Sequence, residues 1–210
     1  MTIDVSGKTG LIGQEILRQA PTAKGDFVFL ALPPERAIQV APHFLRNGIR
    51  VIDMSGAFRL TEVYGIPELF AKEITSARIV ANPGCYALGI IQALLPYYQQ
   101  IKGKIRIVAI SGFSGGGKHA CSPKRLTAYK PGRQHQHIAE IEKTLGLPGQ
   151  IYFYPIVAPW ARGITMEISF LTEAGRMVIR NKLDNITDVV KNAIRVLAIM
   201  DKACSGREGG

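Results

Sequence analysis

Cys85 is the residue in this chain best placed for covalent chemistry. It follows Asn82-Pro83-Gly84, which breaks a candidate strand, and it opens a stretch of helical character. A thiol reacts as the thiolate, and the backbone N–H groups at a helix N-terminus stabilise that form. The pattern therefore predicts a nucleophile, with a buried cysteine that only packs as the alternative.

His135 and His137 are the candidate acid–base groups. They lie two residues apart and are followed by Glu140. One histidine beside a nucleophilic cysteine is a common acid–base arrangement. A zinc site needs more ligands than this segment offers, so we expect no metal. The alternative is a pair of solvated or capping histidines before a helix, with Glu140 as a charge in its first turn.

Two glycine-rich segments have the composition of phosphate-binding loops. The first runs from Gly7 to Gly13, between a short strand at residues 3–5 and a helix at residues 14–19. Strand, glycine turn and helix in this order open a dinucleotide-binding fold. The second, Ser114 to Lys118, follows a strand at residues 105–110 and has the form of an anion nest with a lysine counter-charge. Such loops also occur as closely packed or flexible turns.

The elements around these residues alternate in type. Apolar runs predict strands at residues 27–32, 50–54 and 78–81, and helices are predicted at residues 35–47 and from Cys85 to Leu95. This alternation implies a parallel sheet with right-handed crossovers.

The second half of the chain reads differently. Residues 150–157 and 164–171 predict strands that pair antiparallel, and residues 176–180 complete a hairpin. An amphipathic helix at about residues 187–200 closes the fold.

Composition limits the classes of function. The chain has 210 residues with 47% hydrophobic and 20% charged residues, as in a soluble globular protein with one core or two small domains. A net charge of +10 attracts phosphates as well as nucleic acid, but no nucleic-acid-binding signature is present, so we expect no nucleic-acid partner. No apolar run reaches the roughly 18–20 residues of a membrane span, and no secretory signal precedes the fold, so we expect a cytoplasmic protein without a membrane partner. The three cysteines are too scattered for a disulfide framework.

Taken together, these segments resemble the N-acetyl-gamma-glutamyl-phosphate reductase family, the arginine-pathway relatives of aspartate-semialdehyde dehydrogenase. The matching stretches keep the order of the family and cover most of residues 3–186. They are Gly7 to Gly13, Val51 to Ser55 with Phe58-Arg59, Tyr64 to Leu69, Ala81 to Tyr86, Ser111 to Lys118, His135 to His137 with Glu140-Ile141, Pro159 with Arg162 to Ile164, and Asp184-Asn185.

The resemblance implies an α/β fold with two domains. A shortened Rossmann-like parallel-sheet domain would comprise residues 1–84 with a returning C-terminal helix at residues 185–203. An α+β catalytic domain of the semialdehyde-dehydrogenase type would comprise residues 85–184. It further implies NADPH as hydride donor, N-acetyl-glutamyl phosphate as the small-molecule substrate, and a homo-oligomer (dimer or tetramer).

The resemblance also implies a role for individual residues. Cys85 would attack the acyl phosphate to form a thioester, and His135, six residues after Tyr129, would be the acid–base group, with His137 in reserve. The residues implied to contact substrate are Arg162, His137, Ser111 and Lys118. The residues implied to contact cofactor are Gly7, Gly10, Leu11, Gly13, Ser114, Gly115 and Asn185, the last at the nicotinamide amide.

Three departures from the family pattern keep alternatives open. Only residues 14–26 separate the Gly13 turn from the Phe27 strand, where relatives carry a second strand that reads the adenosine ribose. A long insert after Arg162-Gly163-Ile164 is missing. Bulkier residues (Val189, Val190 and Lys191) follow Asp184-Asn185, and Leu88 replaces a usual threonine.

The alternatives differ in class. One is a shortened, non-catalytic relative that binds anions or a partner. Another is a semialdehyde dehydrogenase that acts on aspartyl or aminoadipyl phosphate with the same cysteine. A third is a chain that lacks segments of a longer protein.

Overall fold

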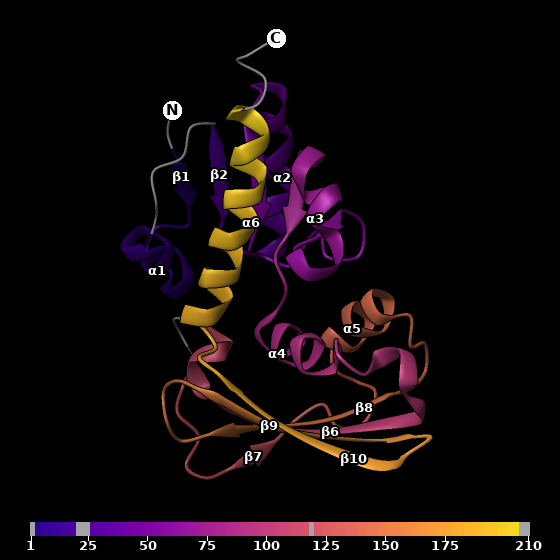
Figure 1. Cartoon of the computed structure of the whole chain (residues 1–210). Coiled ribbons are helices and arrows are strands. Elements are labelled where there is room, and N and C mark those ends of the chain that lie inside the picture. Colours follow the sequence, from indigo (N-terminus) through magenta and orange to yellow (C-terminus); the bar gives the residue numbers. More distant parts are fainter. Residues whose placement is uncertain (1–2, 20–25, 118–119, 206–210) are drawn as a thin grey trace. The chain divides into compact units, whose positions relative to one another are not determined.

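The computed structural model describes residues 3–19, 26–117 and 120–205. The chain divides into two compact units, which are Met1–Gly84 together with Thr187–Gly210, and Cys85–Ile186. We call these the first and second units. Each has its own sheet and its own helices (Figure 1). The chain leaves the first unit directly before Cys85 and returns to it at Thr187.

The first unit is built on a five-stranded sheet in the order β1-β2-β3-β5-β4. Every pair in it is parallel, which confirms the parallel sheet predicted from alternating strands and helices. The strands are β1 (Ile3–Ser6), β2 (Phe27–Leu30), β3 (Arg50–Asp53), β4 (Val63–Tyr64) and β5 (Ile79–Ala81).

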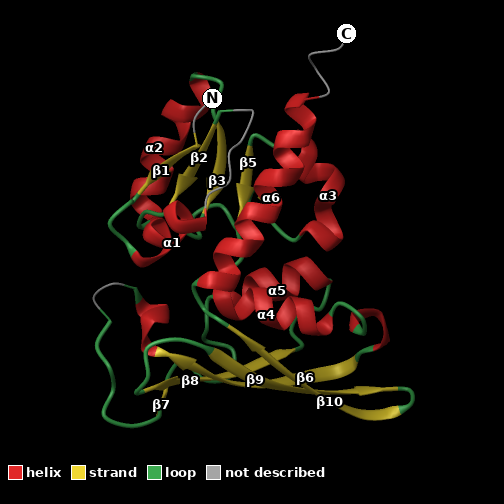
Figure 2. Ribbon diagram, turned by 60° about the vertical axis from the view of Figure 1, so that its left-hand side comes forward, coloured by secondary structure: helices red, strands yellow, loops and turns green. Residues whose placement is uncertain are grey.

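Helices cover both faces of this sheet. On one face, α1 (Leu11–Gln19), α3 (Pro67–Ser76) and α6 (Thr187–Ser205) contribute Ile16, Ile74, Val190 and Leu197 to one apolar cluster. On the other, α2 (Pro34–Arg46) packs Ala37 and Ala41 against β2 and β3. Figure 2 shows the strands between α2 and the pair α3 and α6. Because both faces are covered, all four residues of β2 are buried, as its uninterrupted apolar sequence requires.

β1 is an edge strand. In the usual dinucleotide-binding order the first strand lies inside the sheet, with the second and third strands beyond it. Here β1 pairs with β2 through Val5 and Phe29, and among the described residues no strand lies on its other side. Residues 20–25, between α1 and β2, lie outside the described part of the chain. The shortened connection seen in the sequence therefore corresponds to a sheet that begins at β1.

The second unit has a mixed five-stranded sheet in the order β10-β9-β6-β8-β7. The bounds are β6 (Lys102–Gly112), β7 (Thr127–Ala128), β8 (Ile151–Ala158), β9 (Ile164–Thr172) and β10 (Gly175–Leu183). The predicted antiparallel pairing of residues 150–157 with 164–171 is wrong, because β6 lies between β8 and β9. β6 is parallel to β8 and antiparallel to β9. Alternating hydrophobicity fixes which face of a strand is buried but leaves its neighbour in the sheet undetermined.

Two helices cover one face of this second sheet. α4 (Cys85–Leu94) is apolar nearly all round and packs on α5 (His137–Leu145) and on β10. Two short 3-10 helices, η1 (Tyr98–Gln100) and η2 (Phe113–Gly116), flank β6. The packing of α4 on α5 brings together the start of the chain segment with Cys85 and the segment with both histidines. In the described part of the chain, no helix has the length and apolar character needed to cross a membrane.

Candidate active site

Cys85 is the first residue of α4, as the sequence predicts. Asn82, Pro83 and Gly84 separate the end of β5 from the helix, and the Cys85 thiol forms no disulfide and is partly exposed. The N–H groups of the first helical turn have no carbonyl partners within the helix, so they favour a negative charge at this position. Cys85 therefore has the local geometry of a thiolate nucleophile.

His135 lies in an aromatic cluster directly before α5. Its ring centroid is 5.6 Å from that of Tyr86, 5.7 Å from that of Tyr129 and 5.0 Å from that of Phe153. The residue is only 4% exposed. Burial, with a smaller contribution from the positive charge of Lys130, lowers the pKa of His135 from 6.5 to about 4. The imidazole is therefore neutral at pH 7.

A backbone hydrogen bond orients the His135 ring. The N–H of His137 donates to Nδ1 of His135 over 3.2 Å. Nδ1 is thus an acceptor, and the proton of the neutral ring is on Nε2. The loop that carries Tyr129 is held in an unusual conformation, because Lys130 has a positive φ of 41°.

Tyr86 and Tyr129 connect the histidine cluster with Cys85. Burial raises the pKa of Tyr86 well above its usual range, and burial also raises the pKa of Tyr129. The charge of a Cys85 thiolate adds to both shifts. Both phenols therefore stay protonated and able to donate hydrogen bonds beside the thiol.

His137 differs from His135 in its environment. Its Nε2 lies 3.6 Å from Oε1 of Glu140, and the two side chains are 10% and 4% exposed. Glu140 is in the first turn of α5, as the alternative expects, but both histidines are buried, so the solvated histidines of that alternative are wrong. The His137 imidazole faces this carboxylate, whereas His135 lies among the aromatic rings.

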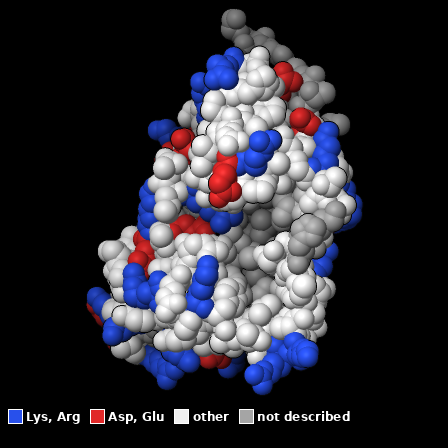
Figure 3. All heavy atoms as spheres, turned by 180° about the vertical axis from the view of Figure 1, so that it is seen from behind, with Lys and Arg blue, Asp and Glu red and all other residues white. Residues whose placement is uncertain are grey.

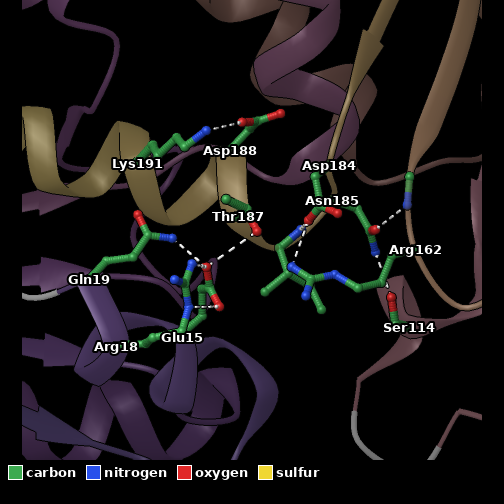
Figure 4. A network of polar contacts seen from close by, with 12 residues as sticks. Glu15, Arg18, Gln19, Ser114, Arg162, Asp184, Asn185, Thr187, Asp188 and Lys191 are labelled. Carbon is green, nitrogen blue, oxygen red and sulfur yellow. Dashed lines mark hydrogen bonds and ion pairs between the residues drawn. The ribbon is translucent and has the colours of Figure 1, made fainter.

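Asn185 ties three segments of the second unit together. Its Oδ1 accepts the N–H of Gly163 over 2.9 Å, and its Nδ2 donates to Oγ of Ser114 over 3.0 Å (Figure 4). Asn185 is 4% exposed. The predicted cofactor residues Ser114 and Asn185 thus contact each other, and Gly115 lies beside them, since a Cβ on Gly115 would be 3.5 Å from Nδ2 of Asn185.

The other residues implied to contact substrate include Arg162, Ser111 and Lys118. Arg162 donates to Asp184 over 2.8 Å, with side chains 42% and 33% exposed (Figure 4). Ser111 is buried, and its hydroxyl donates to the carbonyl of Gly112 over 3.0 Å. Lys118 lies outside the described residues.

The glycine turn of the first unit fits a diphosphate group. A Cβ on Gly7 would lie 2.1 Å from the carbonyl oxygen of Ala31, and one on Gly13 would lie 2.1 Å from that of Gly7. These two glycines let the turn pack against β2 and let α1 approach β1. Gly10 has no such restriction, since its nearest neighbour would be 3.5 Å away. Gly10 donates its N–H to the carbonyl of Gly7 over 3.1 Å, and the space beside its Cα is open directly before Leu11, the first residue of α1.

The first unit also holds a buried carboxylate that the sequence did not single out. Glu15 of α1, 8% exposed, accepts hydrogen bonds from Arg18, Gln19 and the hydroxyl of Thr187 (Figure 4). The bonds from Arg18 are the main reason that the pKa of Glu15 falls from 4.5 to about 2. The spacing from Glu15 to Arg18 was visible in the sequence, but the contact with Thr187 was not.

A second buried network involves the asparagine that precedes Cys85. Asn82 donates through Nδ2 to the carbonyl of Val189 over 3.1 Å and accepts Nδ2 of Asn192 over 2.9 Å. Asn192 also donates to the carbonyl of Gly65 over 2.7 Å. Asn82 and Asn192 are 0% and 2% exposed. The network fixes α6 to the end of β5 within the first unit.

In the ranges 3–19, 26–117 and 120–205, no group of three or more His, Cys, Asp or Glu residues has the arrangement of a metal site. On the face seen in Figure 3, Lys and Arg side chains form separate groups with uncharged surface between them. This dispersed surplus can steer small anions without forming a continuous basic stripe on that face.

The fold and this arrangement of residues are those of the semialdehyde dehydrogenase family. The family model for the semialdehyde dehydrogenase NAD binding domain matches residues 6–77, and the model for the semialdehyde dehydrogenase dimerisation domain matches residues 85–194. The chain belongs to this family.

Among its curated relatives are N-acetyl-gamma-glutamyl-phosphate reductases. That of Thermus thermophilus is 37% identical over 63% of this chain and 45% of its own length, and that of Chlorobaculum tepidum is 36% identical over 69% and 52%. The chain thus spans about half the length of the curated relatives that it matches. The crystal structure of aspartate semialdehyde dehydrogenase II from Vibrio cholerae has the same fold, with a TM-score of 0.81 at 14% identity over 96% of this chain and 98% of that one.

Proposed function

We propose that this protein catalyses the NADPH-dependent reductive dephosphorylation of N-acetyl-glutamyl 5-phosphate to N-acetyl-glutamate 5-semialdehyde, a step of arginine biosynthesis. The observation that carries the proposal is the position of Cys85 at the start of α4, beside Tyr86 and Tyr129, which pack on His135. The identity of 36–37% to named reductases supports the choice of substrate.

The reaction begins at sulfur. The Cys85 thiolate attacks the acyl carbon, a C–S bond forms, and the C–O bond to phosphate breaks with its electrons leaving on the phosphate. The thioester conserves the activation of the acyl group. A bound nicotinamide supplies the hydride that reduces this thioester. The resulting oxyanion re-forms its carbonyl, the C–S bond breaks, and sulfur departs as the thiolate. Hydrogen-bond donors near Cys85 stabilise the oxyanion in both steps.

The second-unit residues have separate tasks in this scheme. Tyr86 and Tyr129 are protonated donors, and the neutral His135 packs against both of their rings. Arg162 binds an anionic group of the substrate, and Ser111 and His137 line the same site. Asn185 with Ser114 orders the loop that contains Gly115, and Lys118 supplies a further positive charge.

The first-unit glycine turn holds the cofactor. Gly7 and Gly13 shape the turn, Gly10 leaves room beside it, and the backbone N–H groups of the first turn of α1, which starts at Leu11, would bind the diphosphate. NADPH rather than NADH is the proposed donor, as in the reductase reaction named above. Cys85 and Cys121 form no disulfide, which suits a reducing compartment, and we propose the cytoplasm. The match to a dimerisation domain supports a homo-oligomer.

One observation favours a second candidate, a non-catalytic relative that keeps the fold. Because β1 is the edge of its sheet, the strand whose end would hold the adenosine ribose is absent from the described residues. A protein of this kind would retain the anion-binding turn and lose turnover.

The deciding experiment is phosphate-dependent reduction of NADP⁺ with N-acetyl-glutamate semialdehyde. The wild type is compared with Cys85→Ser and with Cys121→Ser, which removes the other described free thiol. We expect turnover in the wild type and in Cys121→Ser and none in Cys85→Ser. A folded wild-type protein without turnover would instead support the non-catalytic candidate. NAD⁺ in place of NADP⁺, and aspartate semialdehyde in place of the acetylated substrate, test cofactor and substrate choice.

A further inference from the structure

Tyr86 is the residue of α4 whose ring contacts both candidate acid–base groups. It directly follows Cys85 in the first turn of the helix and is only 3% exposed. Its ring centroid lies 5.6 Å from that of His135, with 87° between the ring planes, and 6.0 Å from that of His137, with 63° between the planes. The first turn of α4 therefore contains the candidate nucleophile and also a ring that packs on both imidazoles.

The two imidazoles belong to a closed group of four rings. Their own centroids are 4.6 Å apart, with 72° between the planes. Phe153 of β8 packs edge to face on Tyr86 at 4.9 Å and on His135 at 5.0 Å. Edge-to-face pairs have preferred distances and angles, and each ring of this group contacts at least two of the others. In a close-packed interior, one ring therefore cannot shift unless its neighbours shift as well.

The ring group joins three segments of the second unit. Phe153 lies within β8, and the histidines lie at the start of α5. Tyr86 is the only aromatic residue of α4, so it alone links that helix to the ring group. Tyr97, the next aromatic residue along the chain, packs on Phe170 at 6.0 Å instead. The position of the two imidazoles relative to the first turn of α4 thus depends on the ring of Tyr86.

The hydroxyl of Tyr86 is distinct from these ring contacts. It is buried and forms no hydrogen bond with a described residue, although the hydroxyls of Tyr129 and Ser111 contribute to its pKa shift. Because the ring makes the contacts with both histidines, a phenylalanine at this position would keep them. The two parts of the side chain can therefore be tested separately.

We infer that Tyr86 is a positioning residue whose ring sets the place of His135 and His137 relative to the first turn of α4. The inference rests on the proposed thioester reaction, in which Cys85 is the nucleophile and His135 the candidate acid–base group. A displacement of about 1 Å in a catalytic group can cost roughly 100-fold in rate. The ring would therefore affect the chemical step through the groups that it holds, without contacting the substrate.

Two substitutions separate the ring from the hydroxyl. Tyr86→Phe removes only the hydroxyl, whereas Tyr86→Met also removes the ring and fills much of its volume with a flexible apolar side chain. We expect kcat of Tyr86→Met to be at least about tenfold below that of Tyr86→Phe, with KM within about threefold of the wild type in both. Equal losses of kcat in the two variants would overturn the inference, because the hydroxyl alone would then account for them.

The matched control is Tyr97→Met, which removes an aromatic contact beyond the other end of α4. This variant should lower the thermal stability, as Tyr86→Met does, but leave kcat close to the wild-type value. If Tyr97→Met lowers kcat as much as Tyr86→Met, the loss comes from a general loosening of the second unit and the inference fails.

A second measurement needs neither turnover nor a substitution of Tyr86. In the wild type, nuclear Overhauser effects should connect the ring protons of Tyr86 with the Cε1–H protons of His135 and His137. The histidine resonances are identified by their loss in His135→Gln and His137→Gln. Absence of these effects in the folded protein would show that Tyr86 does not hold the histidines. A wild type without turnover overturns the proposed function and, with it, the effect on rate, while the Overhauser effects still decide the packing of the rings.

Discussion

The side-chain hydroxyl of Thr187, the first residue of α6, donates to the carboxylate of Glu15 in α1 over 3.2 Å. Glu15 thus forms a polar connection between the helix that follows the glycine turn and the helix by which the chain returns to the first unit. The side chains of Arg18 and Gln19 donate further hydrogen bonds to the Glu15 carboxylate. The carboxylate is therefore buried with its charge compensated, and its pKa lies at about 2.

Glu15 should make the stability of the first unit depend on pH at the acid end. Its folded-state pKa is depressed from 4.5, so its contribution is fully present above pH 4.5 and is lost as the pH falls toward 2. We expect Glu15→Gln to unfold about 1 kcal/mol more easily at pH 7, allowing for the solvent exposure of Arg18. In urea unfolding the difference should shrink as the pH falls below 4.5. A difference that is the same at pH 7 and pH 3 would contradict this account. Thr187→Val, which removes only the hydroxyl, tests the long-range bond.

Gly13 and Gly10 should respond differently to the same methyl group. Gly13→Ala forces a Cβ to 2.1 Å from a backbone carbonyl, so we expect a large loss of thermal stability. Gly10→Ala meets only a 3.5 Å contact, so the fold should tolerate it. The added methyl would nevertheless lie beside the turn that we propose binds the diphosphate, so the Kd for NADPH should rise roughly tenfold or more. Calorimetric titration with NADPH checks this, and an unchanged Kd would remove Gly10 from the cofactor site.

Arg162 should matter for substrate more than for stability. Its ion pair with Asp184 is solvent-accessible, and such pairs contribute about 0–1 kcal/mol. If Arg162 anchors an anionic group of the substrate, Arg162→Ala raises KM for the semialdehyde by about tenfold or more and barely changes the Tm. The matched control is Arg180→Ala, which breaks the exposed pair with Glu167 on the strand pair β9 and β10. Equal effects of both substitutions on KM would argue against a substrate role for Arg162.

Truncation of Asn192 should lower the free energy of unfolding, although we assign Asn192 no role in the reaction. Asn192→Ala leaves Oδ1 of Asn82 and the carbonyl of Gly65 buried without this donor. An unsatisfied buried polar group costs about 1–3 kcal/mol, so we expect a loss of about 2 kcal/mol or more in the free energy of unfolding. The neighbouring exposed residue gives the control, since Lys191→Ala should stay within about 0.5 kcal/mol of the wild type. If urea unfolding gives similar free energies for Asn192→Ala and Lys191→Ala, the hydrogen bonds of Asn192 do not stabilise the fold.

The sequence by itself determined the local features of this protein. Pro83 and Gly84 cannot continue a strand, so α4 begins at Cys85, and the glycine turn before α1 needs residues without a Cβ. The uninterrupted apolar run of β2 required a strand covered on both faces. These features depend on the backbone preferences and hydrophobicity of residues that are adjacent in the chain, and the family motifs lie on them.

Tertiary structure decided the rest, because it depends on which segments meet. Whether β8 pairs with β9 or β6 is set by long-range packing, and alternation alone pointed to the wrong neighbour. The burial of Glu140, the tie from Asn185 to Ser114, and the bond from Thr187 to Glu15 likewise join residues that no spacing relates. The state of His135 belongs to the same class. Its residue type suggested an acid–base group, and the rings that bury it and the N–H that meets Nδ1 keep the imidazole neutral.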